Sequence, residues 1–230
     1  MAPFVTCLTF NMNVSREFIH HKNRGWINSM KSRDLVRFFF SVLAVGAVIT
    51  SVVGFALEWG KYQKLFVSFE ILEIASVLFW FIGVGMIFSV ISQMGFVVFL
   101  TVHRFALEIF RSHSLWNTIQ LFLVIFVLFD LAYLRFLFFG ENESFLPYLW
   151  LPVFIGLFAW IVSYVKQQQS SKKKTFISAM FLMVVITSLE WFPALRVNEE
   201  DWLYLMLFPL LGCNAFQLLA MPRFSKARAT

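Results

Sequence analysis

Long apolar runs, separated by short polar gaps, fill the chain from Arg37 to Met221. A helix crosses the hydrocarbon layer of a membrane with about 20 mostly apolar residues, because the layer is about 30 Å thick and each residue rises about 1.5 Å. The runs are continuously apolar and lack the alternation typical of barrel strands, so they predict helices. Six spanning helices are expected, at Phe38–Leu57, Ile71–Val102, Leu115–Phe139, Phe145–Val165, Thr175–Ala194 and Trp202–Met221. The predicted fold class is therefore all-α, a polytopic integral membrane protein built as a bundle of six transmembrane helices.

The composition supports the membrane interpretation. Hydrophobic residues make up 60% of the 230 positions, aromatic residues 19%, and the mean hydropathy is +0.76. A soluble domain of this length has too little interior for so much apolar surface, whereas lipid-facing helices can carry it. The net charge of +6 does not indicate a nucleic-acid partner, because the basic residues gather at the ends of apolar runs. That position fits anionic lipid headgroups, so the lipid bilayer is the expected partner.

The basic residues also predict the orientation of the chain. Twelve lie in the gaps on one side of the predicted membrane and three on the other, which is a strong positive-inside bias. Both termini are then cytoplasmic, and the chain is expected to be a multi-pass membrane protein. The basic residues of the cytoplasmic side are the anchors Lys31, Arg33, Arg37, Arg104, Arg111, Lys172, Lys173 and Lys174, together with Lys166, Arg223, Lys226 and Arg228; the opposite side holds Lys61, Lys64 and Arg196.

Residues Met1–Ser29 differ from the rest of the chain. Their apolar stretch is too short and too broken for a signal peptide. One interpretation is a cytoplasmic extension that touches headgroups. The other is that residues 1–29 are not part of the natural protein, because Arg24-Gly25-Trp26 can be encoded by a G-rich run resembling a ribosome-binding site, a few codons before Met30. The transmembrane domain is predicted to cover residues 30–230.

Ionisable residues inside the apolar runs require an explanation, because each costs about 2.5–3.5 kcal/mol at mid-helix on insertion scales. Those expected in the outer half of the bilayer or at its edge are Glu70, Glu73, Asp130, Arg135 and Glu190. Asp130 and Arg135 are five residues apart and point about 140° away from each other, so Arg135 is expected to meet Glu73 or Glu190. The group indicates either a structural ion pair, with snorkelling near the helix ends, or an outward-facing pocket for a ligand or ion.

A second set of polar residues is expected toward the cytoplasmic side. It comprises Ser89, Ser92, Gln93, His103, Asn214 and Gln217. Ser89, Ser92 and Gln93 share one helix face by their three- and four-residue spacing. Interhelical hydrogen bonding or contact with a partner explains such a face. Gly83 and Gly85 indicate close helix packing.

Motifs for catalysis and metal binding are missing from the sequence. It contains no G-x-S-x-G elbow, no H-E-x-x-H, no phosphate loop and no CxxC. The two cysteines, Cys7 and Cys213, form neither a disulfide framework nor a zinc spacing. The chain is therefore expected to be non-enzymatic, with no catalytic residues, no metal and no cofactor.

Several strings resemble the KinB-signalling pathway activation proteins (KbaA) of spore-forming bacteria. They are MKSRDLVRFFF (Met30–Phe40), FSVISQMGF (Phe88–Phe96), TVHRF (Thr101–Phe105), SLWN (Ser114–Asn117) and FDLAYLR (Phe129–Arg135). The resemblance covers nearly all of residues 30–230 and leaves out Met1–Ser29. It implies a multi-pass protein needed for activity of the membrane histidine kinase KinB, which feeds the sporulation phosphorelay. These strings are not chemical motifs, so they identify no site.

Two functions remain open from the sequence. The first is a membrane regulator that activates a KinB-like sensor kinase by helix–helix contact in the bilayer, since the loops are too short for a separate signalling domain. The alternative is a small multi-pass transporter or ligand sensor with a polar pocket in the outer half of the membrane. It would use Glu73, Asp130, Arg135 and Glu190, although no inverted repeat is visible. An intramembrane enzyme is the least supported, because no catalytic set can be assembled.

Overall fold

The computed structural model describes residues 32–110, 112–139, 146–170, 175–197 and 199–226. The predicted N-terminal extension, Met1–Ser29, and the basic anchors Lys31, Arg111 and Lys172–Lys174 lie outside these residues. The chain divides into two compact units, one formed by Met1–Phe38 with Met221–Thr230 and the other by Phe39–Ala220. The described part of the first unit consists of the two helix ends at 32–38 and 221–226. The second unit contains the packed helices.

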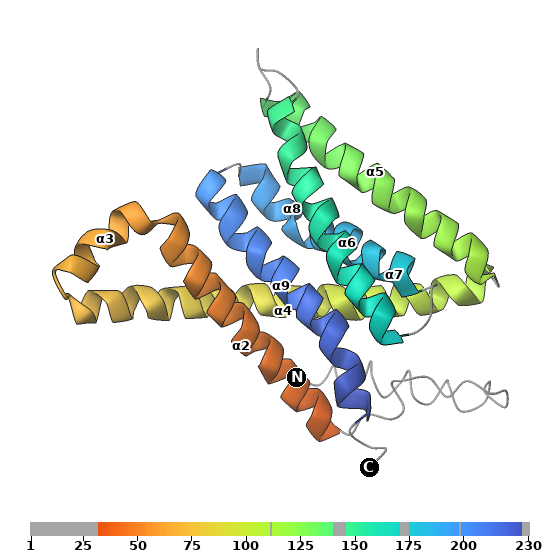
Figure 1. Ribbon diagram of the computed structural model, residues 1–230, viewed down its shortest axis with the longest axis horizontal. Coiled ribbons are helices and arrows are strands. Elements are labelled where there is room, and N and C mark those ends of the chain that lie inside the picture. The colour runs from red at the N-terminus through yellow and green to blue at the C-terminus, as the bar shows by residue number, and fades with distance from the viewer. Residues whose placement is uncertain (1–31, 111, 140–145, 171–174, 198, 227–230) are drawn as a thin grey trace. The chain divides into compact units, whose positions relative to one another are not determined.

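Helices make up almost all of the described chain (Figure 1). They are α2 (Ser32–Leu57), α3 (Trp59–Val67), α4 (Ile71–Phe110), α5 (His113–Phe139), the 3-10 helix η2 (Leu146–Leu149), α6 (Trp150–Ser170), α7 (Thr175–Phe181), the π-helix η3 (Leu182–Ile186), α8 (Thr187–Val197) and α9 (Glu200–Lys226). The consecutive segments α7, η3 and α8 form one continuous helical stretch. The all-helical class predicted from the sequence is confirmed.

Within the part of the chain that the structure describes, six helical segments are long and apolar enough to cross a membrane. They are Arg33–Leu57, Ile71–Phe110, His113–Leu137, Trp150–Ser170, Thr175–Leu195 and Asp201–Met221. These segments overlap the six predicted spans, but several boundaries differ by a few residues. α4 continues eight residues beyond Val102, because no Pro or Gly interrupts it there. α6 starts at Trp150 rather than Phe145, after the tighter turn of η2.

The connection between the first two spans was expected to be a loop, and the structure contains a short helix there. α3 carries a cluster of aromatic rings that packs on the end of α2. Phe55 lies 5.6 Å from both Tyr62 and Phe66, measured between ring centroids, and 5.4 Å from Phe81 of α4. Such edge-to-face contacts stabilise the turn from α2 into α4 and hold α3 as a helix.

The helices differ greatly in how much of their surface they bury. In the most apolar 18-residue stretch of each spanning segment, the buried share is 61% for Thr175–Leu195 and 72% for Asp201–Met221. The corresponding share is only 28% for α2, 28% for α4 and 22% for α5. The core therefore lies around α7, η3, α8 and α9. Trp191, Leu182 and Leu210 are fully buried there.

The ribbons of α2 and α4 cross in Figure 1. Gly46 of α2 and Gly85 of α4 approach each other closely. A Cβ atom on Gly85 would lie 2.7 Å from the carbonyl oxygen of Gly46, and one on Gly46 would lie 2.9 Å from that of Gly85. The two backbones can approach this closely only because neither residue has a side chain. The close packing expected at Gly85 is therefore present, whereas a Cβ on Gly83 would meet nothing within 4 Å.

Candidate functional site

A continuous network of buried hydrogen bonds joins α4, α8 and α9. Gln217 donates from Nε2 to Ser92 Oγ at 2.7 Å, and Ser92 donates to Asn214 Oδ1 at 2.9 Å. The Asn214 amide then donates to Glu190 Oε2 at 2.8 Å and to Thr187 Oγ1 at 2.9 Å. Ser92 comes from α4, Thr187 and Glu190 from α8, and Asn214 and Gln217 from α9. All five side chains are buried, so the network ties three helices together away from solvent.

The spacing of these residues explains how the helices bring them together. Thr187 and Glu190 are three residues apart, as are Asn214 and Gln217, so each pair occupies one face of its helix. The carboxyl group of Glu190 fits against α4 at Gly95, where a Cβ atom would lie 1.7 Å from Glu190 Oε1. Gly95 therefore provides the space that this side chain occupies. The network places Glu190 with residues that the sequence assigned to the other polar set.

Two oxygens of the network have no hydrogen-bond partner among the described residues: Glu190 Oε1 and Gln217 Oε1. Gln93, on the same helix as Ser92, likewise has an unpartnered Nε2. Asn214 has its oxygen and its amide engaged and is the branching point of the network. Three hydrogen bonds meet at this residue, and together they link α4, α8 and α9.

The π-helix η3 lies directly before the network. A π-helix contains one more residue per hydrogen-bonded turn than an α-helix and often appears as a single-turn bulge near functional positions. At its end the Thr187 backbone N–H donates to Leu182 O, and the Thr187 hydroxyl donates to the same oxygen at 3.4 Å. This extra residue changes the helical phase between α7 and α8, and it sets the direction in which Thr187 and Glu190 point.

Ser89 belongs to a neighbouring contact between α2, α4 and α9. Its hydroxyl donates to Gly85 O at 2.9 Å and lies 3.2 Å from Val42 O, both within hydrogen-bonding range. The Cys213 thiol is 3.6 Å from the same hydroxyl. Cys213 is buried and forms no disulfide among the described residues, and it lies at this contact of the three helices.

His103 serves a different junction. Trp116 Nε1 donates to His103 Nδ1 at 3.0 Å, so the side chain links the end of α4 to the start of α5. The Phe99 ring lies beside the same imidazole in a tilted arrangement, with ring centroids 5.9 Å apart. His103 is therefore not part of the network around Asn214. Arg104, the neighbouring basic anchor, is half-buried, and Arg33 and Arg37 are exposed.

The other predicted ionisable residues lie apart from this network. Glu70 and Glu73 are exposed at the beginning of α4, whereas Asp130 and Arg135 of α5 are half-buried. Among the described residues, Asp130 makes no hydrogen bond or ion pair. Glu190 alone of the five predicted residues belongs to the network.

Sequence reasoning missed several buried polar contacts. Gln120 of α5 is fully buried and accepts a hydrogen bond from Ser178 Oγ at 3.1 Å. The Lys166 ammonium group donates to the backbone carbonyl of Leu218, which joins α6 to α9. Thr187 was also missed. The signal available was its three-residue spacing to Glu190, which matches the spacing of Asn214 and Gln217.

Outside the spanning segments, a small cluster of titratable groups lies at the start of α3. Partial burial and a hydrogen bond to Glu58 raise the pKa of Tyr62 to about 12. Burial acts to raise the pKa of Glu58, but hydrogen bonds from Tyr62 and Lys61 and the positive charge of Lys61 together outweigh it, so the pKa is lowered. Lys61 Nζ lies 3.1 Å from Glu58 Oε1.

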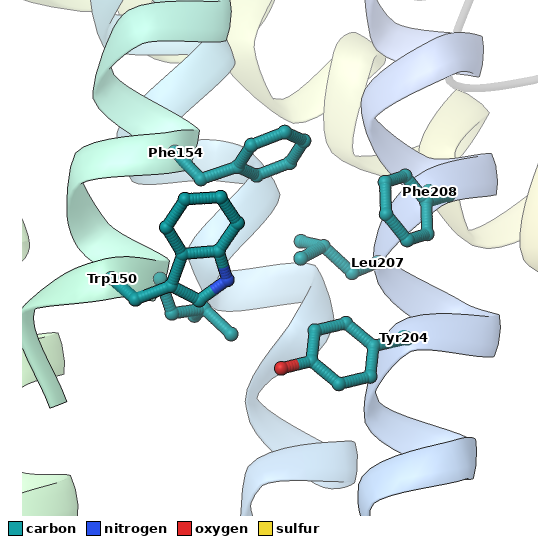
Figure 2. Close-up of a pocket in the computed structure, with 6 residues that line it drawn as sticks. Trp150, Phe154, Tyr204, Leu207 and Phe208 are labelled. Carbon is teal, nitrogen blue, oxygen red and sulfur yellow. The ribbon is translucent and has the colours of Figure 1, made fainter. Parts of the chain in front are cut away.

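A small cavity lies between α6 and α9 (Figure 2). Its volume is about 70 Å³, and it is lined by Trp150, Leu151, Phe154, Tyr204, Leu207 and Phe208. In Figure 2 the rings of Trp150 and Phe154 on one helix lie opposite those of Tyr204 and Phe208 on the other. None of the five ionisable residues predicted to form a pocket lines it. Within the described residues, no three His, Cys, Asp or Glu side chains gather as a metal site requires.

Comparison with known proteins relates this arrangement to a family. The family described as KinB-signalling pathway activation in sporulation, KbaA, matches residues 46–224. A KinB-signaling pathway activation protein of Bacillus subtilis (strain 168) is 74% identical over 197 residues, a match that covers 85% of this chain and 99% of the relative. No solved structure matches. The matched region contains the whole network from Ser92 to Gln217, and the chain belongs to the KbaA family of KinB-signalling pathway activation proteins.

Proposed function

We propose that this chain is a multi-pass protein of the bacterial cell membrane that activates a KinB-like sensor histidine kinase by helix–helix contact in the bilayer, without catalysing a reaction. Family membership supports a role in activating KinB signalling during sporulation. The positive-inside pattern supports cytoplasmic positions for both termini.

The uneven burial of the helices carries this proposal. The last two spanning segments bury 61% and 72% of their most apolar windows, and the Asn214 network fixes them to α4. α2, α4 and α5 leave roughly three-quarters of theirs uncovered. A rigid core with several open apolar helices can bind the transmembrane helices of another protein. Packing between such helices is driven by shape and interhelical hydrogen bonds.

Short connections between helices restrict contact to the bilayer and its surface. α4 ends at Phe110 and α5 begins at His113, so two residues join them. Four residues join α6 to α7, and two join α8 to α9. Segments this short cannot form a folded domain that would reach the cytoplasmic part of a kinase.

Only a modest energy difference is needed for activation. If this bundle packs better against one conformation of the kinase's membrane segments, it shifts the kinase toward that conformation. A differential contact energy of about 1.4 kcal/mol changes the ratio of the two conformations tenfold. One or two interhelical hydrogen bonds provide energies of that size.

The test uses a Bacillus subtilis strain that lacks the 74% identical relative. The full chain, tagged at its C-terminus, is expressed there, and KinB-dependent sporulation is measured. We expect sporulation to be restored and KinB to co-purify after solubilisation in a mild detergent. A KinB variant without its membrane segments is the control and should not co-purify. Full activation without any physical association would refute a mechanism based on contact.

A further inference from the structure

The outward face of α5 is the most open surface among the spanning helices. Only 22% of the most apolar window of α5 is buried. Two pairs of stacked rings follow one another along it: Phe122 with Phe126, and Phe129 with Tyr133, with centroids 6.3 Å and 5.7 Å apart. Between 45% and 65% of each of these side chains is exposed. We call this surface, Phe122 to Tyr133, the α5 ladder.

A carboxyl group interrupts the α5 ladder. Asp130 is four residues after Phe126 and three before Tyr133, so it shares their face of the helix. It lies seven residues, about 10 Å, from the end of the spanning segment at Leu137, which places it inside the apolar span. It is half-buried and has no partner among the described residues. An ionisable group facing lipid without a partner is costly, which favours binding to a complementary group.

The surroundings of Asp130 indicate the chemistry of that group. A carboxylate on the same helix face as Phe126 and Tyr133 offers a cation both a counter-charge and two nearby aromatic rings. Arg135 of a second copy does not fit, because on its own helix it points about 140° away from Asp130 and cannot share a symmetrical α5–α5 interface. A basic side chain on a transmembrane helix of a different protein satisfies both requirements.

We propose that the α5 ladder is the docking surface for a transmembrane helix of the kinase, and that this helix carries an Arg or Lys that pairs with Asp130. The inference rests on the proposed function and adds to it the contact surface and the chemistry of the partner. It makes Asp130 a recognition residue whose partner lies outside this chain. The Asn214 network then serves to hold α4, one of the helices that pack against α5.

The experiment places a photocrosslinker on the α5 ladder of the full chain in the Bacillus subtilis strain described above. Phe126→p-benzoylphenylalanine and Tyr133→p-benzoylphenylalanine test the surface. Leu157→p-benzoylphenylalanine is the matched control, because Leu157 of α6 is 59% exposed. Both α5 positions should crosslink to KinB, and Leu157 should not. Adding Asp130→Asn should lower the yield about tenfold, and Asp130→Glu should keep it within about twofold.

A stability measurement separates recognition from folding. Asp130→Asn removes an unpaired carboxylate, so the purified variant should unfold in detergent at the same temperature as the parent chain, or higher. Crosslinks to KinB from Leu157 but not from α5, or a yield unaffected by Asp130→Asn, would overturn the docking surface and leave the proposed function intact. Crosslinks to a second copy of this chain would likewise overturn it. No KinB crosslink at any position, with no co-purification, would overturn both proposals.

Discussion

The glycine crossing of α2 and α4 allows a prediction that isolates packing from helix propensity. In the variant Gly85→Ala the new Cβ would lie 2.7 Å from Gly46 O, 2.8 Å from Ala47 Cα and 2.8 Å from Thr50 Oγ1. Two of these three atoms belong to backbone. Ordinary contact starts near 3.4 Å, so the two helices must separate by about 0.7 Å. Overpacking of this kind costs about 1–3 kcal/mol.

The variant Gly83→Ala is the matched control, because a Cβ there meets nothing within 4 Å. Both variants replace glycine by alanine in the same helix, and both gain about 1 kcal/mol of helix propensity. That contribution cancels in the difference between them. Gly85→Ala should therefore be less stable than Gly83→Ala by about 1–3 kcal/mol.

The measurement is equilibrium unfolding of both variants by sodium dodecyl sulfate in mixed micelles, followed by circular dichroism. Gly83→Ala should equal or exceed the parent chain in stability. If Gly85→Ala proves as stable as Gly83→Ala, α2 and α4 do not cross at Gly46 and Gly85, and the argument from close backbone approach is wrong.

Three further predictions concern other contacts. Asn214→Ala removes three buried hydrogen bonds, each contributing about 0.6 kcal/mol, and leaves the Glu190 carboxyl without its donor, so the same titration should show a loss of about 2–3 kcal/mol. Gly95→Ala should lower the free energy of unfolding, because the new Cβ meets Glu190 Oε1, and adding Glu190→Ala should recover about 1 kcal/mol of that loss. If the effects of the two substitutions on the free energy of unfolding simply add, the contact between residues 95 and 190 is contradicted. The pKa of Tyr62 is raised to about 12, so its contribution to stability is present below its ordinary pKa of 10.0 and is lost as the pH rises through about 12. Phenolate absorbance should show that Tyr62 ionises at a higher pH than an ordinary tyrosine, and Glu58→Gln should bring its pKa back toward the ordinary value.

The spans of this chain could be predicted from the sequence because their signal is local. A run of about 20 apolar residues is readable without knowledge of its neighbours, and all six segments lie where those runs lie. α3 was missed because its nine residues mix polar and aromatic positions, and its helix depends on rings packing against Phe55. That contact involves two separate helices, which no local pattern reveals.

The network around Asn214 was only partly accessible to sequence reasoning. Polar side chains in apolar helices seek partners, so hydrogen bonds of Ser92, Asn214 and Gln217 between helices follow from a general rule. The inclusion of Glu190 does not follow from it. A helical wheel drawn from Thr175 onward assumes about 100° per residue, but the extra residue of the π-helix shifts every later position by about that angle.

The length of α4 has a mechanical consequence for the surrounding lipid. Exposed apolar side chains run from Leu72 to Val102, a distance of about 45 Å along the helix axis. A hydrocarbon layer about 30 Å thick can cover that stretch only if the helix leans by about 50° from the bilayer normal, which exceeds the usual range of tilt, or if the layer thickens around it. A tilted helix changes its tilt angle when the hydrocarbon layer becomes thicker or thinner. Through α4, the thickness of the bilayer is thereby coupled to the angle at which this protein presents its other helices.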